Sequence, residues 1–214
     1  MTSGGVEAEL KYTASDELPL LELEGAPALG PAHLGSPRMT LEHDRYLDTA
    51  DLRLSAAGWA CRLRERDRGT IVSLKGPPQH HAGEIVHRRD EVEGPARPNL
   101  DPLTWPPSPA RDRLLAFSAG GELLERFGLE QERTERSVGI GELPVGVLSL
   151  DRVRTLYRGS EAGRMFVVEL ELDPAALAVG FDHRPLAEAL GRVPGLSPDP
   201  LSKLERALAL IPAP

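Results

Sequence analysis

The stretch Val6-Glu7-Ala8-Glu9-Leu10-Lys11 sets the pattern from which we predict the fold, because apolar and charged residues alternate along it. In a β-strand successive side chains point to opposite faces of the sheet. One face of this strand would turn its apolar residues toward a core, and the other would gather Glu7, Glu9 and Lys11. Taken alone, the alternation is typical of a half-buried strand with a solvated charged face. A functional interpretation depends on whether other strands repeat the arrangement.

Several segments farther along the chain do repeat it. Residues 59–66 place Arg62 and Arg64 on one face, opposite two apolar side chains. The turn signal Arg68-Gly69 then predicts a hairpin with residues 70–75. The expected strands are residues 6–11, 39–47, 59–66, 70–75, 83–93, 132–139, 145–157 and 164–173. The sequence therefore predicts a protein built mainly from antiparallel strands.

Helices are expected between these strands and at the end of the chain. Spacing and capping signals favour helices over residues 13–23, 111–127, 185–190 and 202–210, and one that starts at Asp173-Pro174. Gly120-Gly121 should split the second of these into two helices. The six prolines of residues 94–109 are typical of a linker. We predict a single domain, residues 1–214, with an N-terminal half 1–93, a Pro-rich linker 94–110 and a C-terminal half 111–214.

Composition argues against several classes of protein. The 214 residues carry a formal net charge of −8, whereas a nucleic-acid-binding protein is normally basic. Aromatic residues make up only 4% of the chain, too few for a base-stacking surface. No apolar run is long enough to span a bilayer, and Cys61 is the only cysteine, which fits a reducing compartment. We expect a cytoplasmic monomer or homodimer that binds neither nucleic acid nor membrane.

The charged faces of the expected strands carry both signs of charge. The acidic members are Glu7, Glu9, Glu91, Glu93, Glu169 and Glu171. The basic members are Lys11, Arg62, Arg64, Lys75 and Arg89, joined by Arg133 or Arg136. Neighbouring carboxylates repel one another unless a cation lies between them, and Mg²⁺ and Mn²⁺ prefer oxygen ligands. Because arginine and lysine hold phosphate oxygens, these groups together are the parts of a phosphoryl-transfer site.

The order of these residues along the chain resembles the CYTH domain of the triphosphate tunnel metalloenzyme superfamily. Glu7-x-Glu9-x-Lys11 is similar to the ExExK signature of that family. Further segments resemble later family motifs in the same order: Tyr46-Leu47-Asp48-Thr49, Arg62-Leu63-Arg64, Leu74-Lys75-Gly76, Arg89-x-Glu91-x-Glu93, Leu150-Asp151, Val168-Glu169-Leu170-Glu171 and Ser202-Lys203. The resemblance implies an α+β fold, a closed antiparallel eight-stranded β-barrel that forms a tunnel, with helices packed outside.

The resemblance also implies roles for individual residues. Metal would be held by Glu7, Glu9, Glu169 and Glu171, with Asp151 either as a further ligand or as a group that supports the ligands. Substrate would be held by Lys11, Arg62, Arg64, Lys75, Arg89, Arg133, Arg136 and Lys203. Either Arg133 or Arg136 could point inward, because their strand fits the family pattern in more than one register. Glu91 and Glu93 would hold a second metal ion or position the attacking water.

The function implied by the resemblance is hydrolysis of a small-molecule triphosphate, with Mg²⁺ or Mn²⁺ as the cofactor. Inorganic triphosphate is the first expected substrate. Thiamine-triphosphatase and class IV-type adenylate cyclase are alternatives, although no adenine pocket is identifiable in the sequence. A non-catalytic module that binds polyphosphate or nucleotides is a third alternative. Glu91 and Glu93 argue against such a module, since a pure polyanion binder has no need of so many carboxylates.

Overall fold

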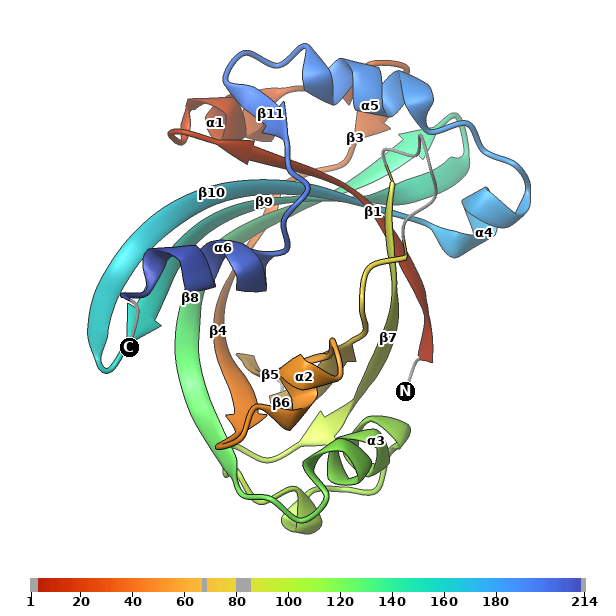
Figure 1. Ribbon diagram of the computed structural model, residues 1–214. Helices are drawn as coiled ribbons and strands as arrows, with labels where there is room; N and C mark the ends of the chain where they lie inside the picture. Colours follow the sequence, from red (N-terminus) through yellow and green to blue (C-terminus); the bar gives the residue numbers. More distant parts are fainter. Residues whose placement is uncertain (1–3, 67–68, 80–85, 213–214) are drawn as a thin grey trace.

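The computed structural model describes residues 4–66, 69–79 and 86–212. In this part of the chain eight antiparallel strands close into a barrel (Figure 1). They are β1 (Gly4–Ala14), β4 (Arg38–Thr49), β5 (Ala60–Arg66), β6 (Gly69–Lys75), β7 (His87–Ala96), β8 (Leu123–Ile140), β9 (Leu143–Tyr157) and β10 (Ser160–Leu172). Their order is β8, β4, β5, β6, β7, β1, β10 and β9, and β9 pairs with β8 to close the ring. The predicted eight-stranded antiparallel barrel is confirmed.

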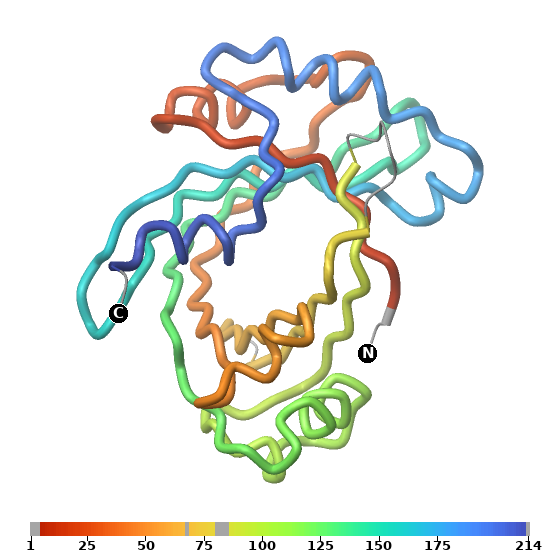
Figure 2. The backbone as a smooth tube through the Cα atoms, viewed as in Figure 1, coloured from red at the N-terminus to blue at the C-terminus, as the bar shows by residue number. Residues whose placement is uncertain are grey.

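The first strand holds two neighbouring strands in register. Glu7 lies opposite Arg89 of β7, and Lys11 lies opposite Glu169 of β10. Figure 2 shows this strand, in red, running beside β7 in yellow-green. Leu10, on the opposite face of β1, is 1% exposed within the apolar core outside the barrel. The alternation in residues 6–11 therefore separates a charged interior from an apolar exterior.

Helices cover the outside of the barrel and one of its ends. They are α1 (Leu18–Gly25), α2 (Arg53–Ala56), the 3₁₀ helix η1 (Pro102–Thr104), α3 (Pro109–Ser118), α4 (Pro174–Ala178), α5 (Arg184–Gly191) and α6 (Lys203–Leu210). Leu10 and Tyr12 of β1 share a core cluster with Leu186 of α5. Leu114 of α3 shares another with Leu63 of β5. The outward faces of the strands are thus buried beneath helices, as expected of a barrel with helices outside.

Three short strands lie at the margins of the barrel sheet. They are β2 (Ala28–Leu29), β3 (Ala32–Leu34) and β11 (Leu196–Pro198). β3 pairs with β8, and β11 pairs with β1 at residues 12–14, beyond the end of β7. Residues 25–37, expected to be a loop because of their Gly, Pro and Ala content, therefore include a small hairpin. None of the helices in the described part of the chain is long and apolar enough to cross a membrane.

The helix predicted over residues 13–23 begins later in the structure. Thr13 and Ala14 belong to β1, because they pair with Val167 and Phe166 of β10. The helix starts at Leu18, with Pro19 in its first turn. Proline suits that position because the first helical N–H groups have no partner within the helix. Pro19 therefore marks the start of this helix.

The second half of the helix predicted over residues 111–127 is a strand. α3 ends at Ser118, and both Ala119 and Gly120 have positive φ angles, of 47° and 79°. Such left-handed conformations end the helix. Leu123 and the residues after it then pair with β4. The leucine spacing is compatible with either element, and pairing with a neighbouring strand decides between them.

The Pro-rich segment 94–110 packs against the barrel over much of its length. Its first residues continue β7 as far as Ala96. Trp105 is 2% exposed in the same core cluster as Leu114. Ser108 caps α3 by accepting a hydrogen bond from the backbone N–H of Arg111, at 3.1 Å. The segment thus connects the two halves of the sequence while contributing to the core.

Candidate functional site

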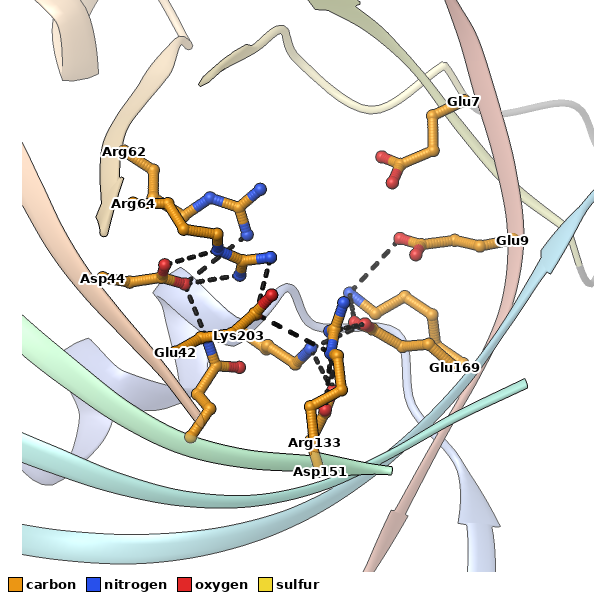
Figure 3. Close-up of polar contacts among 12 residues, drawn as sticks. Glu7, Glu9, Glu42, Asp44, Arg62, Arg64, Arg133, Asp151, Glu169 and Lys203 are labelled. Atoms are coloured by element: carbon orange, nitrogen blue, oxygen red, sulfur yellow. Dashed lines mark hydrogen bonds and ion pairs between the residues drawn. The ribbon is translucent and has the colours of Figure 1, made fainter. Parts of the chain in front are cut away.

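The interior of the barrel receives charged side chains from all eight strands. Figure 3 shows Arg62 and Arg64 on one side of this interior, with Glu7 and Glu9 on the opposite side. The ion-paired interior residues are Glu7, Glu9, Lys11, Glu42, Asp44, Arg62, Arg64, Lys75, Arg89, Glu91, Glu93, Arg133, Asp151 and Glu169, together with Lys203 of α6. Most of the predicted site residues are thus brought together in one place.

Arg64 is fully engaged by carboxylates of β4. Its Nε and Nη2 donate to the two oxygens of Asp44, each at 2.6 Å, and its Nη1 lies 2.7 Å from Oε2 of Glu42. Gln131 also donates to Asp44, at 2.6 Å. Burial raises the pKa of Asp44, but the charges of Arg62 and Arg64 outweigh it, so that the pKa falls to about 2. This group is a tightly bonded ion pair inside the barrel.

A second ion-pair cluster joins α6 to β8, β9 and β10. Arg133 donates to both oxygens of Asp151, at 2.7 and 2.8 Å. Lys203 Nζ lies 2.5 Å from Asp151 and 2.6 Å from Glu169. α6 begins with the predicted capping box of Ser202 and Glu205, which fixes the first turn and so places Lys203. Since both oxygens of Asp151 are occupied, a role as metal ligand would require Arg133 or Lys203 to move.

Three other cations keep donors free. The Nε atoms of Arg62 and Arg89 are buried without a hydrogen-bond partner among the described residues. Arg62 lies 3.6–3.9 Å from carboxylates, and Arg89 lies 3.8 Å from Glu9. Lys11 Nζ is 3.7 Å from Glu9 and 3.8 Å from Glu169. Buried donors are normally satisfied, so these cations offer hydrogen bonds to an anion.

Lys75 and Glu91 lie between these groups. Lys75 Nζ donates to both oxygens of Glu7, at 2.7 and 2.8 Å, and lies 3.5 Å from Glu91. Glu91 also accepts from Ser73 Oγ at 2.6 Å. Burial raises the pKa of Glu91, but the positive charges of Lys75 and Arg62 lower it by a larger amount. The pKa of Glu91 is therefore below its ordinary value. Glu91 is therefore an ionised, firmly oriented carboxylate.

The remaining carboxylates have the chemistry of a divalent-cation site. Glu9 is 4% exposed, and burial, followed by Glu169 and Glu7, raises its pKa to about 7. Burial and Glu7 likewise raise the pKa of Glu171. Such shifts mean that these carboxylates lack enough positive charge nearby. The oxygen-only donor set fits Mg²⁺ or Mn²⁺. Among the described residues, no three acidic, His or Cys side chains are already grouped as ligands around one point.

Arg136 corrects one of the predicted site residues. Its guanidinium donates to the backbone carbonyls of Leu23, Glu24, Ala26, Leu34 and Gly35 at distances of 2.6–3.2 Å. These carbonyls belong to α1 and the β2–β3 region, outside the barrel. Arg133, three residues earlier, points inward, so strand alternation places Arg136 outward. Arg136 anchors the outer segments and does not contact the tunnel.

Glu42, Asp44 and Gln131 are interior residues that the sequence analysis did not identify. The sequence predicts a strand over residues 39–47, and in a strand Glu42 and Asp44 lie on the same face, opposite His43. Both carboxylates share the face of β4 that pairs with the arginine face of β5, where Asp44 lies opposite Arg64. The same Arg-x-Arg pattern that identified Arg64 could therefore have predicted acidic partners on the neighbouring strand.

One end of the barrel interior is apolar. Tyr46, Leu129, Val153 and Val167 cluster there with Ala207 of α6. Each of these strand residues lies two positions from an inward charged or polar residue, which places it on the same face. Leu129 is 0% and Val167 1% exposed. α6 therefore closes this end, while Glu171 remains exposed at the other.

Comparison with known proteins agrees with this architecture. The family model of the CYTH domain matches residues 6–178, most of the chain. The chain therefore belongs to the CYTH family. No functionally curated protein matches it in sequence.

Solved structures with the same fold have low sequence identity to the chain. HpAC1 from Hippeastrum, a candidate adenylyl cyclase with a dominant triphosphatase activity, is 22% identical, with a TM-score of 0.66 over 97% of this chain and 98% of that one. A candidate adenylate cyclase from Bacillus halodurans is 21% identical, with a TM-score of 0.61 over 94% and 98%. The PH1819 protein from Pyrococcus horikoshii OT3 is 15% identical, with a TM-score of 0.54 over 94% and 98%. These similarities extend over the whole barrel.

Proposed function

We propose that this protein hydrolyses a triphosphate with the help of a divalent cation, and that inorganic triphosphate is its substrate. The observation that carries the proposal is the set of free buried donors on Arg62 and Arg89, beside carboxylates whose pKa values are raised. An anion and a cation bound together would satisfy both sets of groups. The substrate class agrees with the triphosphatase activity given for HpAC1.

The proposed binding mode assigns different residues to the phosphates and to the cation. Arg62, Arg89 and Lys11 would bind phosphate oxygens, with Lys75 joining them once its bond to Glu7 is exchanged. Mg²⁺ or Mn²⁺ would be held by Glu9 and Glu171, and by Glu7 and Glu169 once their bonds to Lys75 and Lys203 are exchanged. When bound, the cation supplies positive charge that offsets the charge of the phosphate oxygens.

The proposed reaction is attack of water on a terminal phosphorus. The water oxygen forms a bond to phosphorus as the bridging P–O bond breaks, so triphosphate and water give diphosphate and phosphate. Glu91, fixed by Ser73 and Lys75, would orient the water. Glu93, whose side chain is 33% exposed, would accept its proton and release it to solvent. Arg62 lies 3.9 Å from both carboxylates and would stabilise charge on the leaving group.

Phosphate release from a substrate panel tests the proposal. The panel contains inorganic triphosphate, thiamine triphosphate and ATP, each with Mg²⁺, with Mn²⁺ and with a chelator. We expect metal-dependent release from inorganic triphosphate far beyond the protein concentration. Preferred turnover of thiamine triphosphate would make thiamine triphosphate the substrate in place of inorganic triphosphate. Formation of cyclic AMP from ATP would identify a cyclase in place of a hydrolase. Tight triphosphate binding without turnover of any substrate would identify a binding module and overturn the hydrolase.

Glu9→Gln tests the assignment of the cation site. The substitution keeps the shape of the side chain but removes a negatively charged ligand, so we expect turnover to fall at least about a hundredfold. Calorimetry should show weaker Mn²⁺ binding in the same variant. Glu130→Gln is the matched control, because Glu130 pairs with Arg154 on the exposed outer face. Unchanged turnover and Mn²⁺ affinity in Glu9→Gln would remove Glu9 from the cation site.

A further inference from the structure

Three arginines converge on the carboxylate of Glu42. Oε1 accepts a hydrogen bond from Arg66 Nε at 2.8 Å, and Oε2 forms an ion pair with Arg64 Nη1 at 2.7 Å but has no hydrogen-bond partner among the described residues. Arg133 Nε is 3.9 Å from the same carboxylate. The side chains of Glu42 and Arg64 are each 2% exposed. The carboxylate is thus a buried anion flanked by cationic side chains of two strands, β5 and β8, of which Arg66 is 45% exposed.

Such a pocket is an anion-binding site that the chain fills with its own side chain. Planar guanidinium groups bind phosphate oxygens through the same paired N–H donors that bind a carboxylate. Without Glu42, Arg64 Nη1 and the guanidinium of Arg66 would lose the carboxylate that they now face, while Arg133 would keep its hydrogen bonds to Asp151. Asp44 would still hold Arg64 through Nε and Nη2, so the guanidinium would keep its position. The vacated space would then suit a phosphate group.

The pocket continues the row of phosphate-binding cations proposed above. Arg62, Arg64 and Arg66 alternate along the same face of β5, and residues two apart on a strand are separated by about 7 Å. Arg62 keeps a buried donor free, whereas Arg64 donates two hydrogen bonds to Asp44 and forms an ion pair with Glu42. The free part of the row therefore stops between Arg62 and Arg64. Figure 3 shows both guanidinium groups projecting into the same interior, with Glu42 at the Arg64 side.

We propose that Glu42 occupies an anion subsite at the end of the phosphate row, and that it thereby limits the length of the phosphate chain the site accepts. The existence of the subsite is independent of catalysis, while the limit on chain length rests on the proposed triphosphatase function. A chain with a fourth phosphate would have to displace the Glu42 carboxylate from its arginines. Glu42 is thus a specificity-determining residue that favours triphosphate over longer linear polyphosphates.

Orthophosphate binding tests the subsite without any need for turnover. We compare wild type with Glu42→Ala by calorimetry, in the presence of a chelator. The variant should bind one additional orthophosphate, or bind it at least about tenfold more tightly than wild type. Glu161→Ala is the matched control, because Glu161 also contacts two arginines, Arg164 at 2.8 Å and Arg154 at 3.8 Å, but at the exposed β9–β10 turn. Equal orthophosphate binding by wild type and a folded Glu42→Ala would overturn the subsite.

A more conservative variant tests the same proposal if Glu42→Ala does not fold. Glu42→Gln fills the same volume and removes the negative charge that competes with phosphate for the arginines. It should bind orthophosphate at least several-fold more tightly than wild type, and orthophosphate should raise its melting temperature more than that of wild type. Circular dichroism establishes that the variant is folded. Identical affinity and identical thermal response in folded Glu42→Gln would contradict the proposal.

Hydrolysis of linear phosphates tests the limit on chain length. We compare kcat/KM for triphosphate and tetraphosphate in wild type, Glu42→Ala and Glu161→Ala. Wild type and the control should prefer triphosphate, and Glu42→Ala should shift the ratio toward tetraphosphate by at least about tenfold. An unchanged ratio would overturn the limit on chain length. If wild type hydrolyses neither compound, the proposed function fails, while orthophosphate binding still decides whether Glu42 fills an anion subsite.

Discussion

At the scale of single residues, two arginines of one strand face differ in what they can bind. Arg62 and Arg64 are two positions apart on β5, and both point into the barrel. Arg64 has two carboxylates of β4 within 2.7 Å, whereas the nearest carboxylate to Arg62 is at 3.6 Å. Neighbouring carboxylates therefore turn Arg64 into a structural ion pair and leave Arg62 available for an anion. The residue type alone does not distinguish these roles.

Asp44 makes stability depend on pH in the acid range. Its pKa is lowered from 3.8 to about 2, so the unfolded chain binds a proton at higher pH than the folded protein does. This contribution to stability is complete above about pH 4 and is lost as the pH falls toward 2, and it amounts to about 2 kcal/mol. Asp44→Asn should remove it, and should also destabilise the protein at pH 7 by about 3–5 kcal/mol because Arg64 loses its partner.

Urea unfolding at pH 5 and pH 2.5 measures this effect. The difference in unfolding free energy between wild type and Asp44→Asn should shrink by about 1.5 kcal/mol at the lower pH, since part of the contribution persists above pH 2. Asp112→Asn serves as the control, because Asp112 is an exposed residue in the first turn of α3. A difference between wild type and Asp44→Asn that stays constant across this pH range would show that Asp44 does not titrate as described.

At the scale of elements, the two faces of β8 make different kinds of contact. Arg133 points inward to Asp151, and Arg136 points outward to five backbone carbonyls of α1 and the β2–β3 region. Arg136 is only 5% exposed, so these carbonyls would be left without partners if it were removed. The strand therefore links the interior of the barrel to the segments that cover it.

Lysine substitutions separate the two roles. Arg136→Lys should lower the unfolding free energy by about 2–4 kcal/mol, because a single ammonium group cannot reach all five carbonyls. Its KM for the substrate should stay unchanged, since the side chain lies outside the barrel. Arg133→Lys should instead lower turnover at least about tenfold. Denaturant unfolding and steady-state kinetics measure both quantities. A raised KM with unchanged stability in Arg136→Lys would return that residue to the tunnel.

Elements with strict alternation could be predicted from the sequence, and those shaped by neighbours could not. Residues 6–11 have charged side chains at every second position, which share one face in a strand but not in a helix, and they form a strand. Residues 123–127 carry leucines that suit either a helix or a strand, and pairing with β4 makes them a strand. Arg133 and Arg136 fit the same family motif, and only the register of β8 against β9 shows that Arg133 faces Asp151. In both cases the pairing with a neighbouring strand determines the structure, because the local sequence pattern fits two alternatives.

The same limit applies to the candidate site. Glu7, Glu9, Glu91 and Glu169 are recognisable because they lie in charged alternating segments that resemble family motifs. Glu42 was overlooked, since one acidic residue among His43, Asp44 and Arg45 carries no motif by itself. Its importance comes from Arg64 and Arg66, which β5 brings opposite β4. Such contacts depend on strand register, which is set by the whole sheet.

At the scale of the whole molecule, the closed barrel has two different ends. α6 and an apolar cluster that includes Leu129 and Val167 fill one end. At the other end Glu171 and Val147, which pair across β10 and β9, are exposed, the latter by 40%. A charged substrate cannot pass readily through a packed apolar region, because its charges would be buried there without water or hydrogen-bond partners. Substrate and products should therefore pass through the same mouth.

Bulky substitutions at the two ends test this polarity. Val147→Trp places a large side chain at the open mouth, and we expect KM for the triphosphate to rise by about fivefold to tenfold, because access is narrowed. Leu208→Trp is the matched control: Leu208 lies on α6 at the closed end and is 51% exposed, so the added ring can extend into solvent. Its KM should match wild type. Steady-state kinetics, with thermal melts to establish folding, decide the outcome. The opposite pattern, with Leu208→Trp impaired and Val147→Trp unaffected, would mean that substrate reaches the interior past α6 and that the apolar cluster opens during turnover.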